Sequence, residues 1–172
     1  MDKIIDVADY VVKRYHELTG EKLDEMKLHK LLYFTQRESF AILGRPAFEG
    51  EFEGWKYGPV SCEVRDYFLN GKIIVPTIPI SEDIQYIVSN VIMEYGSLPS
   101  WKLSELSHRE ISWNNSRKGL SQEESGNRVI ALNDIKEDAK KVRPYDYVWD
   151  MYYDEFEDCD VEKVASYDRK NM

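Results

Sequence analysis

The sequence KLHKLLYFTQRESFAILGRPAFEGEFEGWKYGPV, from Lys27 to Val60, decides the fold of this chain. Its first half is densely apolar and ends at a glycine that is soon followed by a proline, a pair typical of a helix end. Asp24 stands just before it as a candidate N-cap, so the pattern predicts a helix over 25–43. A helix that is apolar over such a wide arc is usually central to its domain.

Among the polar residues of this predicted helix, three stand out: His29, Lys30 and Gln36. We expect them to face solvent, with the lining of a groove as the alternative. Residues 47–57 alternate aromatic or glycine with glutamate, which predicts a short extended arm. A turn over 57–60 follows, and Ser61 is placed to cap a helix over 62–69.

Helical spacing of apolar residues recurs on both sides of this stretch. It predicts an amphipathic helix over 2–18 that ends at Gly20, and a third long helix that begins at Ser81 and is capped by Gly96. Pro99 opens a short helix, a turn near His108 leads into another, and Asn133 is a candidate cap for a last helix over 134–142. The polar interval 119–129 is the best candidate for a mobile loop, and 72–80 for an extended connector, because prolines interrupt it.

The predicted fold class is therefore mainly α: a single globular helical domain with a small extended or β element near residues 47–57. We place the domain at 1–143 and an acidic, aromatic C-terminal segment at 144–172. We also expect the tryptophans of the domain, Trp55, Trp101 and Trp113, to be substantially buried.

Composition restricts the function. The 172 residues carry a formal net charge of −9, which argues against a general binder of nucleic-acid backbones and is compatible with a basic protein partner. The two cysteines form no CxxC pair, and the three histidines make no zinc pattern. No apolar run suits a signal peptide or a membrane span. We expect a cytoplasmic protein with no cofactor, no metal, no nucleic-acid partner and no membrane association.

Catalytic motifs are weak in this sequence. His108 and Glu110 could form an acid–base pair, but residues this close in sequence point apart on most backbones. Cys62 could be a nucleophile at a helix N-terminus, yet no partner base can be named, and a structural cysteine is more common. Glu49, Glu51 and Glu53 share one side of the arm, where they are better explained as protection of an exposed edge than as a cation site. We therefore predict no enzymatic activity.

The C-terminal segment concentrates the negative charge. From Tyr145 to Glu162 there are eight acids and no base, interleaved with six aromatic residues at partly helical spacing. One reading is an aromatic face that docks on the protein's own core; the other is a partner-binding surface of rings within a negative field. On the second reading the candidate contact residues are Tyr145, Trp149, Tyr152, Asp154 and Phe156.

Several ordered motifs give this chain a family resemblance. They are KLHKLLYF at 27–34, Gly44-Arg45-Pro46, FEGWKYGPV at 52–60, Glu94-Tyr95-Gly96, LSELSHRE at 103–110, and Trp113. The set, which covers roughly residues 5 to 140, resembles the Panacea domain of SocA-like and GepA-like antitoxins, a family of phage-associated and prophage proteins. Gly54 stands where the family often has alanine, and Ser107 where it often has threonine.

The resemblance implies a mostly helical antitoxin that neutralises a cognate protein toxin by direct binding. The alternative is an adaptor that delivers its partner to a cellular protease; a hydrolase using the region of His108 and Glu110 ranks lower. Among the motif positions, the leucines are best read as core. The polar or half-polar positions Lys30, Lys56, Tyr57 and Arg109 are better candidates for partner contacts.

Overall fold

The computed structural model describes residues 1–71 and 79–143 of the chain. The chain divides into a compact unit, Met1–Val142, and a second unit, Arg143–Met172; the described helices and strands all belong to the first. The predicted connector at 72–80 lies mostly outside the described residues, and the acidic C-terminal segment lies wholly outside them.

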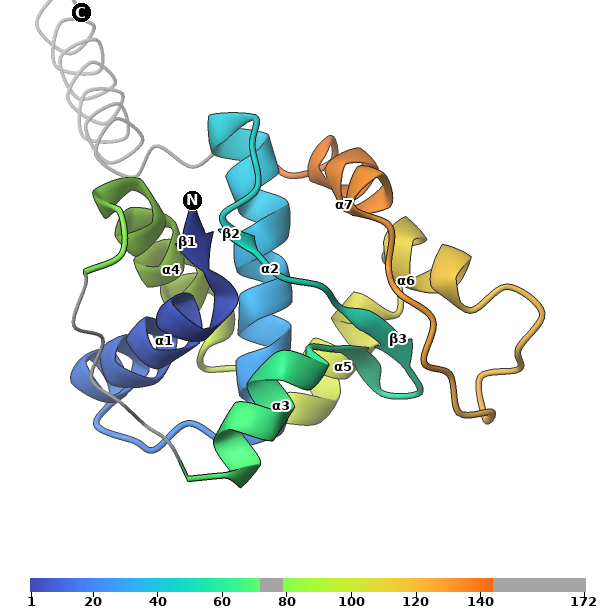
Figure 1. Cartoon of the computed structure of the whole chain (residues 1–172), viewed down its shortest axis with the longest axis horizontal. Coiled ribbons are helices and arrows are strands. Elements are labelled where there is room, and N and C mark those ends of the chain that lie inside the picture. The colour runs from blue at the N-terminus through green and yellow to red at the C-terminus, as the bar shows by residue number, and fades with distance from the viewer. Residues whose placement is uncertain (72–78, 144–172) are drawn as a thin grey trace, which may run out of the picture. The chain divides into compact units, whose positions relative to one another are not determined.

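The described residues are mostly helical, as predicted. The helices are α1 (Ile4–Thr19), α2 (Glu25–Leu43), α3 (Cys62–Leu69), α4 (Glu82–Tyr95), α5 (Ser100–Ser107), α6 (Ile111–Ser116) and α7 (Leu132–Ala139). Four short strands accompany them: β1 (Asp2–Lys3), β2 (Phe48–Glu49), β3 (Glu53–Trp55) and β4 (Gly58–Val60). Helix α2 runs through the middle, with α1 and α4 on one side and α6 and α7 on the other (Figure 1).

The central helix begins and ends where its local sequence requires. The Asp24 carboxylate accepts a hydrogen bond from the backbone N–H of Lys27, which satisfies one of the free donors of the first turn. Gly44 ends the helix in the left-handed conformation with φ of 68°, which glycine adopts at little cost. Both boundaries of the predicted 25–43 helix are thus confirmed.

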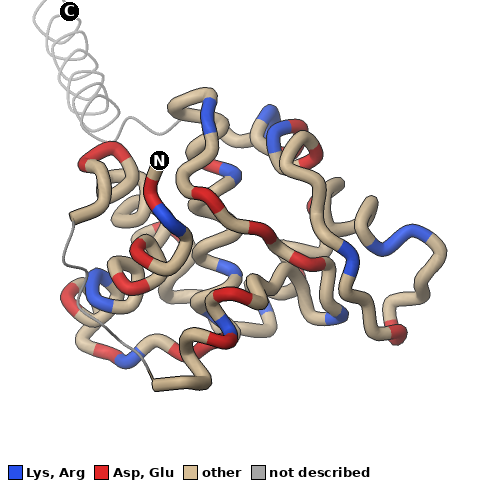
Figure 2. Tube along the Cα trace, viewed as in Figure 1, with Lys and Arg blue, Asp and Glu red and all other residues tan. Residues whose placement is uncertain are grey.

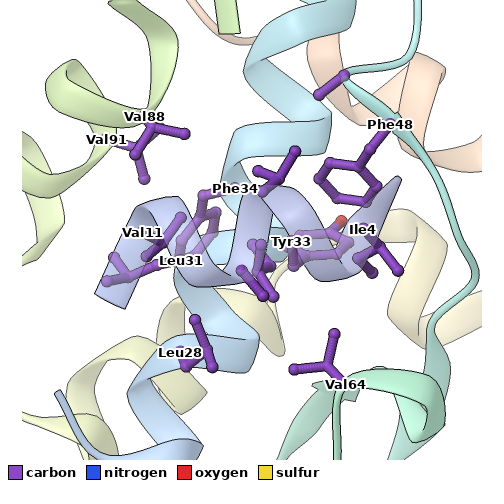
Figure 3. Close-up of a cluster of buried hydrophobic side chains, with 14 of the residues drawn as sticks. Ile4, Val11, Leu28, Leu31, Tyr33, Phe34, Phe48, Val64, Val88 and Val91 are labelled. Carbon is purple, nitrogen blue, oxygen red and sulfur yellow. The ribbon is translucent and has the colours of Figure 1, made fainter. Parts of the chain in front are cut away.

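The core forms around α2 because that helix is buried on almost every side from Lys27 to Ser39. It contacts α1, α3, α4, α5, α7 and β4. Figure 3 shows Leu28, Leu31 and Phe34 of α2 meeting side chains of α1 and α4 in one apolar cluster. Polar contacts join the helices on the opposite side of α2. There the Asp138 carboxylate of α7 accepts hydrogen bonds from the backbone N–H groups of Ile111 and Ser112, at the start of α6.

The predicted extended arm is real, but the turn that follows it lies earlier than predicted. Strand β2 pairs in parallel with β1, whereas β3 and β4 form an antiparallel hairpin in which Trp55 lies opposite Gly58. The turn therefore falls at Lys56 and Tyr57, and the predicted turn over 57–60 is wrong because 58–60 is a strand. Acidic positions follow one another along the arm (Figure 2).

Two other predictions need correction. Helix α7 begins at Leu132 after Ala131, so the predicted cap Asn133 already lies inside it. The polar loop over 119–129, predicted to be mobile, is irregular but tied down. Its end joins β3, since Gly54 N–H donates to the Arg128 carbonyl and Ile130 N–H donates to the Phe52 carbonyl. The Arg117 guanidinium also donates to the carbonyls of Ser121 and Glu124 within it.

Candidate partner-binding surface

His29, Lys30 and Gln36 of α2 are buried, so the expectation that they face solvent is wrong. Gln36 donates to the Phe48 carbonyl and accepts from the Ala47 N–H, and so fastens the extended arm to α2. His29 accepts the Ser61 N–H through Nδ1, 3.3 Å away, and its Nε2 lies 3.3 Å from the Glu25 carboxylate. The hairpin and α3 cover a face of α2 that would be solvated in an isolated helix.

Lys30 is the most deeply buried cation of this region, at 1% exposed. Its Nζ donates to the Pro59 carbonyl at 3.1 Å, and Gly58 approaches its stem so closely that an added Cβ would stand 2.6 Å from Cε. Burial lowers the pKa of Lys30 to about 8, and the negative charge of Asp24 only partly opposes that shift. The ammonium group therefore stays mostly protonated at pH 7.

A pocket of about 440 Å³ opens where α2, the hairpin, α3 and the loop before α7 meet. Its lining comprises Glu25, Met26, His29, Lys30, Trp55, Lys56, Tyr57, Val60, Arg65, Ser125 and Gly126. Two of its cations are paired at the rim, because Arg65 forms an ion pair with Glu25 at 3.0 Å and Lys56 one with Glu123 at 3.3 Å. We call this cavity the Lys30 pocket.

A second hollow of about 560 Å³ lies beside the Lys30 pocket and shares Met26 and Tyr57 with it. Its other lining residues are Ser100, Trp101, Ser104, Glu105 and His108. Three of these lining side chains are large, apolar and exposed: Met26, Tyr57 and Trp101. We call the two hollows and these three side chains the Tyr57 surface. Exposed apolar groups gathered in this way mark interaction sites more often than scattered ones do.

The tryptophans divide between core and surface. Trp113 is buried and donates from Nε1 to the Trp55 carbonyl at 2.8 Å, as expected, and Trp55 is half-buried. The prediction for Trp101 is wrong, since that side chain is 68% exposed. The spacing carried the signal: Leu103 faces the core, and a residue two positions earlier in a helix lies on a different face.

The structure brings together three of the sequence-predicted contact residues. Lys30, Lys56 and Tyr57 all line the Lys30 pocket, although Lys30 does so from the interior. Arg109 is exposed and forms an ion pair at 3.0 Å with Glu105, a lining residue of the second hollow. Tyr145, Trp149, Tyr152, Asp154 and Phe156 lie outside the described residues. Sequence reasoning missed Met26, Trp101 and Arg65.

His108 and Glu110 make separate sets of contacts. The His108 ring stacks on Trp113 with centroids 4.1 Å apart, and burial lowers its pKa. Glu110 is buried and forms ion pairs with Arg37 at 2.6 Å and Lys141 at 2.8 Å. Among the described residues, the hydrogen bonds and ion pairs of these two side chains are made with other residues and do not join His108 to Glu110.

Other candidate chemistry is also weak. Burial raises the pKa of the Cys62 thiol to about 11, and the nearby Glu53 adds to the shift, so the thiolate that a nucleophile needs is disfavoured. Within residues 1–71 and 79–143, no cluster of three metal-ligating side chains is found. None of the described helices combines the length and apolarity that crossing a membrane requires.

Comparison with known proteins identifies the family. The model of the family described as "Antitoxin SocA-like, Panacea domain" matches residues 28–114, which is half of the chain and runs from α2 through most of α6. Antitoxin SocA of Caulobacter vibrioides (strain NA1000 / CB15N) is 29% identical over 103 residues, covering 50% of this chain and 55% of that protein. The chain thus spans about half the length of this curated relative. No solved structure matches it. By the extent of the family match, the chain belongs to the family described as "Antitoxin SocA-like, Panacea domain".

Proposed function

We propose that this protein is the antitoxin of a toxin–antitoxin pair and that it neutralises a protein toxin by direct binding through the Tyr57 surface. The observation that carries the proposal is the position of that surface. Met26, Tyr57 and Trp101 line a single hollow, and Tyr57 and Trp101 lie within the part of the chain that matches the antitoxin family. Aromatic side chains at the centre of an interface supply most of the binding energy in many complexes.

The physical setting suits a protein partner. Tyr57 sits in a two-residue hairpin turn, and its carbonyl accepts a hydrogen bond from the Ser104 hydroxyl at 2.8 Å, so its backbone has little conformational freedom to lose on binding. The ring of Tyr57 also lies beneath the Lys56 ammonium group, 5.3 Å from its centroid. The surface therefore combines rigid apolar area with polar groups at its edge, as protein interfaces do.

Co-expression tests the function. The protein encoded beside this one should arrest growth when expressed alone and should lose that effect when this chain is present. A purified mixture without protease should show stoichiometric inhibition, because the proposal is neutralisation by binding. A neighbouring product that is harmless, or that is neutralised only when protease is added, would contradict the proposal.

Matched surface variants locate the interface. Tyr57→Ser and Trp101→Ser should each weaken binding at least tenfold, the size of effect expected for a hot-spot residue. Met93→Ser is the control, since Met93 is 58% exposed against 57% for Tyr57 but lies on α4, away from this surface. If Tyr57→Ser and Trp101→Ser bind the toxin as tightly as the control Met93→Ser does, the toxin binds elsewhere.

The acidic segment Tyr145–Glu162 remains a second proposed contact. Its charge should speed association with a basic toxin, so the on-rate should fall as salt rises. Trp149→Ala should mainly raise the off-rate if its ring is in the interface. A large drop in melting temperature with affinity unchanged would instead show that the segment is structural.

A further inference from the structure

Lys30 is a buried cation whose charge the nearby Asp24 carboxylate balances only in part. Its Nζ has the Pro59 carbonyl as hydrogen-bond acceptor, and no Asp or Glu lies within ion-pair distance of it among residues 1–71 and 79–143. An ammonium group can donate three hydrogen bonds, and a charge taken out of water is costly unless it is paired. The other cations of the pocket differ, since Arg65 and Lys56 each have a carboxylate partner.

The position of this charge is fixed by the packing around it. Gly58, at φ of 109°, brings the hairpin backbone against the Lys30 stem, and an added Cβ at Gly58 would collide with it. The Nζ–Pro59 bond ties the end of the same side chain to β4. The ammonium group cannot move out into solvent without displacing the hairpin, so the charge stays fixed among the residues that line the pocket.

The surroundings narrow the chemistry of the occupant. Trp55 and Tyr57 provide aromatic walls, and Met26 and Val60 add apolar area. Glu25 pairs with Arg65 and Glu123 with Lys56, so the positive charge left over in the lining is that of Lys30, in a chain whose net charge is −9. Burial lowers the pKa of His29 to about 4, so that ring stays neutral at pH 7 and contributes no charge. The volume falls within the usual range for ligand pockets.

We propose that the Lys30 pocket binds a carboxylate on an apolar or aromatic stem, contributed by an acidic side chain or the C-terminus of the protein partner, with Lys30 as its counter-ion. The assignment of the carboxylate to the protein partner rests on the proposed function. The choice of a carboxylate as the bound group rests on the lining of the pocket alone. A free small carboxylate offers the same group, and the experiment must distinguish the two sources.

The first experiment uses small probes on the unaltered protein. Phenylbutyrate and its uncharged amide are titrated separately into the protein at pH 7, and the backbone N–H signals of the protein are followed by ¹H–¹⁵N NMR. The acid should give saturable shifts at Tyr57, Ser125 and Gly126, and the amide should bind at least tenfold more weakly, because a charge-assisted hydrogen bond is lost. Equal binding of acid and amide, or no saturable shift with the acid, overturns the inference.

The second experiment tests Lys30 itself. Lys30→Met should reduce phenylbutyrate affinity at least tenfold, whereas Lys136→Met, an exposed lysine on α7, should leave it unchanged. Bound acid should also raise the pKa of Lys30, as followed by ¹³Cε NMR, since an added anion favours the charged form. If Lys30→Met fails to fold, the comparison of phenylbutyrate with its uncharged amide on the unaltered protein still tests the inference. Unchanged acid affinity in folded Lys30→Met refutes the role of Lys30.

A competition experiment identifies the source of the carboxylate. Phenylbutyrate should displace the protein encoded beside this one from the antitoxin, and the amide should not. If the acid binds the pocket without displacing that protein, the pocket takes a free carboxylate and the partner assignment is refuted. Neutralisation of growth arrest without any acid binding would leave the antitoxin function standing and would overturn only the pocket inference.

Discussion

Replacement of Arg37 by methionine should remove a buried ion pair that joins α2 to the start of α6. The guanidinium is 5% exposed, lies 2.6 Å from the Glu110 carboxylate and donates to the Tyr95 hydroxyl at 2.8 Å. It also lies over the Phe34 ring, 4.7 Å from the centroid. Arg37→Met retains the apolar stem but leaves Glu110 buried with a single cation, Lys141, which is half exposed.

The expected cost is about 3 kcal/mol of unfolding free energy. Removal of one partner of a buried ion pair costs roughly 3–5 kcal/mol, and the remaining Lys141–Glu110 pair places this case at the lower end. The control is Arg109→Met, which breaks an exposed pair with Glu105 and should cost about 0.5 kcal/mol or less. The two variants make the same chemical change, so their difference isolates burial.

Urea unfolding followed by far-UV circular dichroism measures both variants. The slope of unfolding free energy against urea should stay constant, so that a shifted midpoint reports stability alone. The double variant Arg37→Met/Glu110→Met should recover more than half of the loss, because neither buried charge is then left behind. A cost below about 1 kcal/mol for Arg37→Met, or a double variant as unstable as the sum of its parts, would refute this reasoning.

Three further predictions concern buried groups of α2 and the hairpin. Burial raises the pKa of Glu38 from 4.5 to about 8, so between these values the folded protein holds a proton that the unfolded chain has released, and stability falls as pH rises. From pH 5 to pH 8, the unfolding free energy of Glu38→Gln, measured in urea, should rise relative to that of the wild type by on the order of 4 kcal/mol. Parallel pH profiles of the two proteins would contradict this. Burial lowers the pKa of His29 to about 4, and its Nδ1 accepts a hydrogen bond from the Ser61 N–H. NMR of the ring nitrogens should therefore show a neutral ring at pH 5. The contribution of neutral His29 to the stability of the fold should be complete above pH 6.5 and should be lost as the pH falls toward 4. A ring already protonated at pH 6 would refute that assignment. Gly58→Ala should cost about 1–3 kcal/mol more in urea unfolding than Gly44→Ala, since both glycines have positive φ but only a Cβ at Gly58 meets neighbouring atoms; equal costs would show that the hairpin yields.

Sequence alone was sufficient for the positions of most helices. The 25–43 helix, its Asp24 cap and its Gly44 end were predicted to the residue, and so was Ser61 as the cap of α3. These features depend on hydrogen bonds and backbone dihedrals within a few residues, so the local sequence determines them. At α7, where Ala131 precedes the helix and no side chain caps it, the prediction missed the boundary.

The candidate site depended on contacts between distant parts of the chain. The sequence pointed to Lys30, Lys56 and Tyr57, but it placed Lys30 in solvent and Trp101 in the core, and the structure reverses both. A helical pattern tells which residues share a face; it does not tell what covers that face. The hairpin covers Lys30, and no described element covers Trp101. Local hydrogen bonding therefore determined the helices of this protein from its sequence, whereas the packing of remote segments alone decided which charge is buried and which ring is left exposed.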